Sequence, residues 1–154
     1  MKKILTWVLI IVLVIIAGVI ISIDKRAPSS DEVSEVERVR IAGALVSVQV
    51  ASTISAWAQG LGGQESLGED EGMLFVFDTP ARRSFYMKDM NFPIDIIWLD
   101  ENMQVVYIKE NAEPDSYPEE TFTPDQKAKY VLEVNAGFVE RNGITLGSTM
   151  EFVR

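Results

Sequence analysis

The sequence predicts a mainly β domain, an antiparallel β-sandwich or barrel-like fold with one or two short helices, preceded by a single transmembrane helix. Three observations support this prediction. Short runs of β-branched and aromatic residues alternate with Gly, Pro, Asn and Asp beyond residue 38. Only two segments there carry helix signals, and a long uncharged apolar run lies near the N-terminus. About eight short strands with so little helix favour a sandwich or barrel over an α/β fold.

The apolar run extends from Ile4 to Ile23 and contains no charged residue. As a helix it would be about 30 Å long, which matches the hydrocarbon core of a bilayer. The run is longer than the apolar part of a cleaved signal peptide, and no Ala-x-Ala cleavage site follows it. A lipoprotein signal would need a Cys, and the chain has none. We therefore expect residues 4–23 to lie in the lipid bilayer as an uncleaved, single-pass signal anchor.

The charges around the anchor bear on its orientation. Lys2 and Lys3 precede it and Lys25 and Arg26 follow it, so the positive-inside rule gives nearly equal weight to both orientations. The very short N-terminal tail favours a cytoplasmic N-terminus and an extracytoplasmic domain at the cell membrane. Residues 24–37 are charged and contain Pro and Ser, which is typical of a flexible polar tether. The folded domain is then expected over residues 38–154.

The elements of this domain follow from local patterns. One helix is expected over Ile54–Leu61, with Ser52 or Thr53 as its N-cap and a Gly pair after its end. A second helix is expected over Ala136–Arg141, closed by an Asn-Gly pair. The expected strands are Val39–Ile41, Leu45–Ala51, Met73–Phe77, Arg83–Met87, Ile94–Leu99, Val105–Lys109, Tyr130–Val134 and Met150–Val153.

Composition excludes several classes of function. The chain has 14 Lys and Arg against 23 Asp and Glu, a net charge of −9, which argues against a nucleic-acid partner. Without Cys or His there is no disulfide, thiolate or imidazole metal site, or His-dependent serine triad. The acidic loops Glu65–Glu71 and Glu110–Asp125 could collect calcium, but neither has the spaced ligands of an EF-hand. We therefore expect no cofactor and no dedicated metal site.

Two carboxylates interrupt strands that are otherwise apolar. Alternation along residues 94–99 places Asp95 on one face with Ile97 and Leu99. Along residues 130–134 it places Glu133 on one face with Val131. A buried carboxylate costs several kcal/mol unless it is paired or hydrogen-bonded. Both carboxylates are therefore expected to have partners.

The nearby cations, Lys88, Arg82 and Arg83, are the available partners, and two interpretations remain open. In the first, a cation pairs with Asp95 or Glu133 inside the fold and fixes the register of the strands. In the second, Lys88, Asp95 and Glu133 form a polar cluster that lines a pocket. Burial would then raise the pKa of one carboxyl group while a cation keeps the other ionised, which separates a general acid from a general base.

Several phrases of the sequence together resemble the domain-of-unknown-function family 192, over about residues 44–153. They are Ala58-Gln59-Gly60-Leu61, Glu65-Ser66-Leu67, Glu69–Phe77, Ser84–Lys88, Pro93–Ile97 and Tyr130–Gly137. The resemblance implies a mainly β sandwich, often exported behind a signal or anchor, with no established activity. The matching positions are Gly60, Leu61, Gly72, Met73, Phe85, Met87, Lys88, Pro93, Asp95, Leu132, Glu133 and Gly137. The chain departs from the usual pattern at Gly62, at Tyr86 and at Asp89-Met90.

These observations together predict a membrane-anchored extracytoplasmic domain that acts as a binding or envelope-associated module. Its partner, besides the bilayer, would be a small molecule, a glycan or an envelope protein. The alternative is a carboxylate-dependent hydrolase of a glycan-type substrate that uses Asp95 and Glu133. That chemistry requires two carboxyl groups roughly 5–9.5 Å apart across an open cleft, so the positions of these two side chains distinguish the alternatives.

Overall fold

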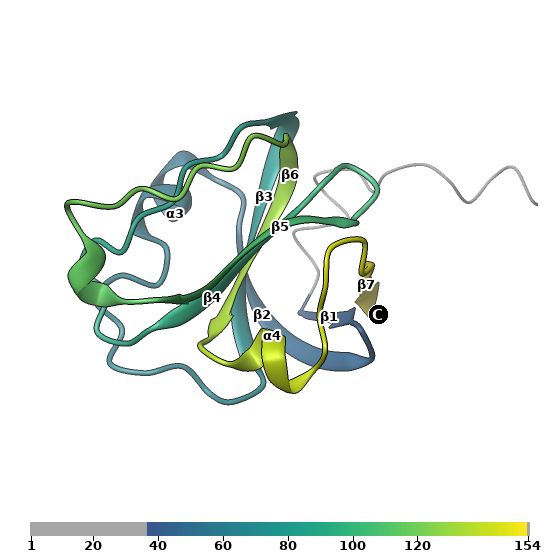
Figure 1. Cartoon of the computed structure of the whole chain (residues 1–154), viewed down its shortest axis with the longest axis horizontal. Helices are drawn as coiled ribbons and strands as arrows, with labels where there is room; N and C mark the ends of the chain where they lie inside the picture. Colours follow the sequence, from purple (N-terminus) through teal and green to yellow (C-terminus); the bar gives the residue numbers. More distant parts are fainter. Residues whose placement is uncertain (1–36, 154) are drawn as a thin grey trace, which may run out of the picture.

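The computed structural model describes residues 37–153, which form a single seven-stranded sheet with two short α-helices (Figure 1). The predicted mainly β class with little helix is therefore confirmed. The strands lie in the order β5-β4-β6-β3-β2-β1-β7. Their bounds are β1 Arg38–Ile41, β2 Ala44–Ala51, β3 Glu71–Ala81, β4 Ile94–Leu99, β5 Val105–Ala112, β6 Ala128–Asn135 and β7 Met150–Val153.

The sheet is mixed, so the predicted antiparallel arrangement is wrong at one pair. Strands β2 and β3 run parallel, with Ser47 opposite Glu71 and Ala51 opposite Phe75. The chain between them contains helix α3 (Ile54–Gln59) and is long enough to return to the end of the sheet where β2 began. The other strand pairs are antiparallel.

The sheet curls on itself into a half-barrel instead of forming two packed sheets. Its two edges meet where the β4–β5 turn contacts the segment before β7. The Val105 N–H donates to the Ser148 carbonyl at 2.8 Å, and the Met150 N–H donates to the Met103 carbonyl at 2.9 Å. These bonds join elements from opposite ends of the strand order. The structure therefore agrees with the barrel-like alternative of the prediction and not with the sandwich.

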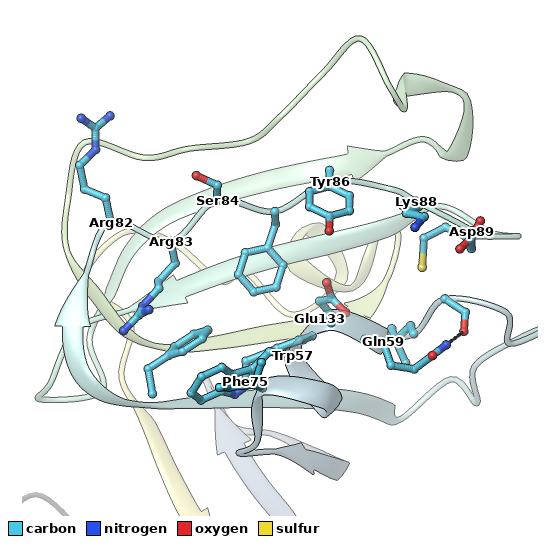
Figure 2. A pocket seen from close by; sticks show the side chains of 18 residues that line it. Trp57, Gln59, Phe75, Arg82, Arg83, Ser84, Tyr86, Lys88, Asp89 and Glu133 are labelled. Atoms are coloured by element: carbon cyan, nitrogen blue, oxygen red, sulfur yellow. Dashed lines mark hydrogen bonds between the residues drawn. The ribbon is translucent and has the colours of Figure 1, made fainter.

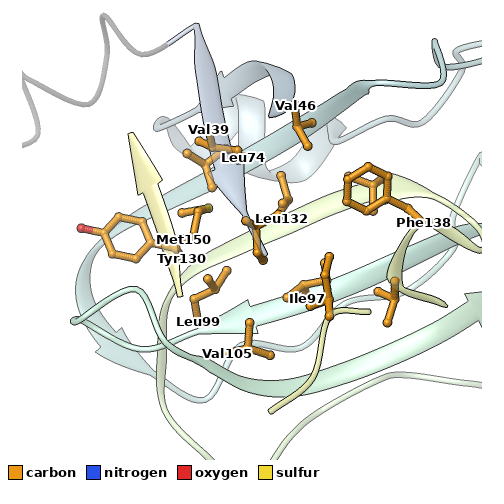
Figure 3. Packing of buried hydrophobic residues seen from close by; sticks show 14 of the residues in the cluster. Val39, Val46, Leu74, Ile97, Leu99, Val105, Tyr130, Leu132, Phe138 and Met150 are labelled. Atoms are coloured by element: carbon orange, nitrogen blue, oxygen red, sulfur yellow. The ribbon is translucent and has the colours of Figure 1, made fainter. Parts of the chain in front are cut away.

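One face of the sheet is closed by its own curvature. Strands β1 and β7 bring Val39 and Met150 over Leu74, Ile97 and the other residues of this face (Figure 3). Helix α4 (Phe138–Arg141) covers the rest of it through Phe138 and Val139. We call this the closed face; its buried residues are Val39, Ile41, Val46, Leu74, Val76, Ile97, Leu99, Val105, Tyr130, Leu132, Val134, Phe138, Val139, Ile144 and Met150.

The other face is covered by α3 and by residues 82–92, and we call it the open face because it carries the cavity described below. Ile94, Ile96 and Trp98 point to it, while Ile97 and Leu99 point to the closed face, as alternation along this strand predicted. The buried residues of the open face are Ala51, Leu61, Met73, Phe75, Phe77, Met87, Ile94, Ile96, Trp98, Ala112, Phe122, Ala128 and Val131.

The predicted strand Arg83–Met87 is wrong. This segment is extended but makes only an isolated bridge, between Phe85 and Phe122. Strands β3, β6 and β4 are each already paired with a strand on both sides. The segment cannot pair with any of them, so it crosses the open face instead of joining the sheet. Its Phe85 ring packs edge-on against Phe75 at 4.8 Å and Trp98 at 5.7 Å between ring centroids.

Both predicted helices are present but shorter than expected. Thr53 is the N-cap of α3, and its hydroxyl accepts a hydrogen bond from the Ala56 N–H at 3.2 Å. The helix ends at Gln59, and its C-cap is Gly60, whose φ of +51° is rare for residues other than Gly. The acidic segment predicted as a long loop begins inside β5 and includes a short 3₁₀ turn at Pro114–Ser116.

No helix within residues 37–153 is long and apolar enough to cross a membrane. The predicted anchor, residues 4–23, lies outside the described residues. So does the predicted tether, residues 24–37, apart from Glu37.

Candidate functional site

A cavity of about 520 Å³ opens on the open face, between α3, β3 and the segment that follows β3. Figure 2 shows Trp57 and Phe75 on one side of it, Tyr86 on the other, and Glu133 between them. The lining residues are Ile54, Trp57, Ala58, Gln59, Gly60, Leu61, Gly62, Phe75, Phe77, Arg82, Arg83, Ser84, Phe85, Tyr86, Lys88, Asp89, Met90 and Glu133.

The wall formed by α3 is fixed at both ends. The Trp57 indole N–H donates to the Ala51 carbonyl at 2.9 Å, and its ring packs 4.9 Å from that of Phe77. At the other end the Gln59 amide donates to the Gly62 carbonyl at 2.7 Å. A Cβ atom at Gly62 would lie 3.2 Å from the Lys88 carbonyl oxygen, so the absence of a side chain there lets the two walls approach.

The opposite wall is the segment from Arg82 to Met90. The bridge to Phe122 and the edge-on contacts of Phe85 hold it over the sheet. Tyr86 lies at the mouth of the cavity, 48% exposed, with its ring centroid 5.7 Å from that of Tyr117. The aromatic residues of the two walls make the cavity a slot lined by flat rings.

Glu133 enters the cavity from β6, in the middle of the sheet. Its partner residues across the strands are Met73 and Ile96, so no neighbouring strand offers it a cation. The side chain is 6% exposed, and its Oε2 atom has no hydrogen-bond partner among the described residues. Burial raises the pKa of Glu133 to about 8. The carboxyl group is therefore mainly protonated at neutral pH.

The cations that the sequence offered as partners do not pair with Glu133. Arg82 extends away from the cavity and bonds Asp125 at 3.1 Å (Figure 2). Arg83 donates to the Thr79 carbonyl at 2.6 Å, and its guanidinium lies 3.9 Å from the centre of the Phe77 ring. Desolvation lowers the pKa of Arg83, and the charge of Asp78 offsets part of that shift.

Asp95 does not line the cavity. It points to the closed face, where it is fully buried. Its two carboxylate oxygens accept hydrogen bonds from the Asn111 N–H and the Val139 N–H, each at 2.9 Å. The first of the two interpretations, an ion pair inside the fold, does not apply to Asp95, because backbone amides take the place of a cation. The second of these bonds supplies the N-terminus of α4 with an acceptor that Gly137, its N-cap, cannot provide.

The carboxylate pair required by the hydrolase alternative does not form. Asp95 lies opposite Val134 and Glu133 lies opposite Ile96 in the antiparallel β4–β6 ladder. Because neighbouring positions alternate between faces, the two side chains leave the sheet in opposite directions. No three acidic side chains among residues 37–153 come together in a way that could hold a metal ion.

Of the three side chains put forward from the sequence, Lys88 and Glu133 line one cavity and Asp95 lies across the sheet from it. Trp57, Arg83 and Tyr86 also line the cavity, and none of them was predicted from the sequence as a site residue. Phe75 and Phe77 line it as well, although both are buried in the core of the open face. The signal available was the pair of phrases that contain Gln59-Gly60-Leu61 and Ser84–Lys88, which form the two walls.

Comparison with known proteins identifies the family. The model of DUF192, described as an uncharacterized ACR, matches residues 35–152. The chain resembles the crystal structure of a Sinorhizobium meliloti 1021 protein described as a candidate transcription regulator, with a TM-score of 0.70 and 32% identity over 75% of this chain and 92% of that one. It also resembles a protein of unknown function from Novosphingobium aromaticivorans DSM 12444, with a TM-score of 0.71 and 30% identity over 84% and 95% of the two chains. No curated protein matches. The chain belongs to the DUF192 family.

Proposed function

We propose that this DUF192 domain is a binding module that holds a small organic molecule in the cavity of the open face, with Glu133 as its polar anchor. One observation carries the proposal. Glu133 is a buried carboxyl group that lines the cavity and has an oxygen without a hydrogen-bond partner among residues 37–153. Native proteins rarely leave such groups unpaired, because their desolvation is not compensated.

A purely structural role does not account for Glu133. An apolar side chain at this position would fill the space between Met73 and Ile96 without that desolvation cost. Groups that reduce stability in the free protein are typical of binding sites, where the ligand supplies the missing partner. The position of Asp95 shows that the same sheet can satisfy a buried carboxylate completely where no cavity is present.

The size and lining of the cavity favour a small molecule over a protein or a long glycan. Its volume of about 520 Å³ falls within the range of roughly 300–1,000 Å³ that is usual for small-molecule sites. Aromatic walls with a few convergent polar groups are also usual for such sites. Only one of the two carboxylates that hydrolysis would have used lines this cavity, so nothing in its geometry favours the hydrolase.

The proposal places this module at the outer side of a membrane. The support comes from the sequence alone: the apolar run of residues 4–23, the charged tether that follows it and the short N-terminal tail. A reporter that works only outside the cytoplasm, fused after Arg154, should be active. Activity of a reporter that works only in the cytoplasm would contradict this placement.

The binding proposal is tested on the full-length chain in detergent. We would titrate it calorimetrically with four probes of different charge and shape: benzoate, benzyl alcohol, benzylamine and methyl glucoside. At least one probe should bind with a stoichiometry of one. The variant Glu133→Met should weaken that binding by about tenfold or more, since the ligand loses its polar anchor. Glu120→Met is the matched control, because Glu120 is exposed and lies outside the cavity.

Three outcomes would contradict the proposal. If none of the four probes binds, the cavity is not a site for small organic molecules of this size. If a probe binds equally well to wild type and to Glu133→Met, Glu133 is not its anchor. Equal loss in Glu133→Met and Glu120→Met would show that the loss of binding does not depend on the carboxyl group in the cavity.

A further inference from the structure

The charges around the cavity are opposite in sign to the charge of the chain. The chain as a whole carries −9, whereas the charged residues that line the cavity are three cations and two carboxylates. The cations are Arg82, Arg83 and Lys88, and the carboxylates are Asp89 and Glu133. Because Arg82 pairs with Asp125 outside the cavity and Glu133 is mainly protonated at neutral pH, the charge of the lining comes from Arg83, Lys88 and Asp89. In a strongly acidic protein, a site whose lining is net positive attracts an anion and not a cation.

Two of these cations have no carboxylate partner. Within residues 37–153, salt bridges join Arg40 to Glu151 and Arg82 to Asp125, and neither Arg83 nor Lys88 takes part in one. Arg83 is engaged by the Thr79 carbonyl and the Phe77 ring. Lys88 is exposed, lines the cavity and has no hydrogen-bond partner among the described residues, so its ammonium group is available to a ligand.

Several polar groups that line the cavity are hydrogen-bond donors. Lys88 and Arg83 can only donate, and the Tyr86 hydroxyl is directed toward Glu133 in Figure 2. Burial keeps the pKa of Glu133 near 8, so that its carboxyl group also donates at neutral pH. The titratable or charged residues that share the cavity with Glu133 all come from residues 82–89. The positions next to Glu133 on β3 and β4 are the apolar Met73 and Ile96, and the apolar Leu61 follows α3.

We propose, on the basis of the binding function above, that the ligand is a flat aromatic carboxylate. Its ring lies in the slot between Trp57 and Phe75 on one side and Tyr86 on the other, and its carboxylate is held by Lys88. Glu133 donates a hydrogen bond to an oxygen atom of the ligand. In this arrangement every polar group of the ligand is an acceptor, which complements the donors of the lining.

The test compares three probes that share a benzyl-sized ring and differ in charge: benzoate, benzyl alcohol and benzylamine. The full-length chain should bind benzoate at least about tenfold more tightly than either of the others, as expected for one charge-assisted contact. Lys88→Met should remove that preference. Lys127→Met is the matched control, because it deletes the same charge from an exposed residue away from the cavity and should leave the preference intact.

A second variant tests the part assigned to Glu133. Gln has the shape of Glu and remains a neutral donor, so Glu133→Gln should bind benzoate within about threefold of wild type, whereas Glu133→Met should not. An ammonium ligand would need the ionised carboxylate and would be lost in both variants.

Tighter binding of benzylamine than of benzoate would contradict the proposal that the ligand is an aromatic carboxylate, but it would still support a binding function. A preference for benzoate that survives in Lys88→Met would overturn the assignment of Lys88. Failure of all three probes, with methyl glucoside bound, would reject the aromatic ligand alone. Failure of all four would reject the binding function itself.

Discussion

Asp95 and Glu133 are the two buried carboxylates of the described domain, and they lie on neighbouring strands of one sheet. On the closed face, Asp95 accepts hydrogen bonds from two backbone amides, and apolar residues from β1, β7 and α4 complete the packing. On the open face, Glu133 meets a cavity and lacks a partner for one of its oxygens. Burial alone therefore does not distinguish a structural carboxylate from a candidate ligand-binding one; the set of hydrogen-bond partners does.

The two carboxylates also differ in what they contribute to the stability of the fold. Asp95 joins β4 to the end of β5 through Asn111 and to α4 through Val139, so it ties three elements. Glu133 ties no elements by hydrogen bonds, and its burial raises its pKa. Substitutions at these two positions should accordingly move the free energy of unfolding in opposite directions.

The largest effect is expected for Asp95→Ala. It leaves the N–H groups of Asn111 and Val139 without acceptors in the interior and opens a small cavity. We expect the free energy of unfolding to fall by about 3–5 kcal/mol, which is close to the whole stability of many small domains. Urea denaturation of the full-length chain in detergent, followed by circular dichroism, measures the loss.

Asp95→Asn is the graded control for this prediction. Its amide retains one oxygen, which can accept from one of the two N–H groups, so the loss should be smaller than in Asp95→Ala. If Asp95→Ala is as stable as wild type, the bracing role of Asp95 is wrong and the contrast between the two faces disappears.

The second effect concerns the pH dependence of stability and comes from Glu133. Its pKa is raised from 4.5 to about 8 in the folded domain. Between these values the folded state binds more protons than the unfolded state, so stability falls as pH rises and levels off above pH 8. The slope is about 1.4 kcal/mol per pH unit, or about 3 kcal/mol between pH 5.5 and 7.5.

Glu133→Gln isolates this contribution because Gln does not titrate. The two proteins should be nearly equal in stability near pH 4, below the unfolded pKa of Glu133, and the variant should be more stable by several kcal/mol near pH 8. Thermal unfolding at a series of pH values gives the difference directly. Parallel profiles for wild type and Glu133→Gln would show that the Glu133 carboxyl group is not desolvated in the folded state.

The sequence predicted part of the difference between Asp95 and Glu133. Alternation within each strand correctly predicted the neighbours of Asp95 and of Glu133 on their respective faces. That the two faces are opposite depends on the register of β4 against β6, and local patterns do not contain this information. The partners of Asp95 could not be predicted either, because they are backbone N–H groups, which every residue except Pro carries.

The cavity could not be predicted from local patterns either, because it depends on contacts between segments that are far apart in the sequence. Arg83–Met87 has the composition of a strand, but the occupied positions beside β3, β6 and β4 force it across the open face. The parallel return through α3 supplies the second wall. The cavity that contains Lys88 and Glu133 therefore forms only because the segment after β3 crosses the open face and the β2–β3 connection passes over the same face. The local sequence pattern of neither segment indicates this arrangement.

The smallest effect is expected at the helix of the open face. Each face carries one short helix, and the hydrogen-bond acceptor at the N-terminus differs between the two helices. For α4 the acceptor is the buried Asp95 of β4, and for α3 it is the exposed Thr53 directly before the helix. Thr53→Ala should lower the free energy of unfolding by about 1 kcal/mol, the usual value for an N-cap and well below the loss for Asp95→Ala. Because α3 forms one wall of the cavity, hydrogen exchange of the amides at residues 54–59 should speed up in this variant while that of residues 138–141 does not. A loss at Thr53 equal to that at Asp95 would mean that the open face contributes as much to the stability of the fold as the closed face, contrary to the division drawn between them.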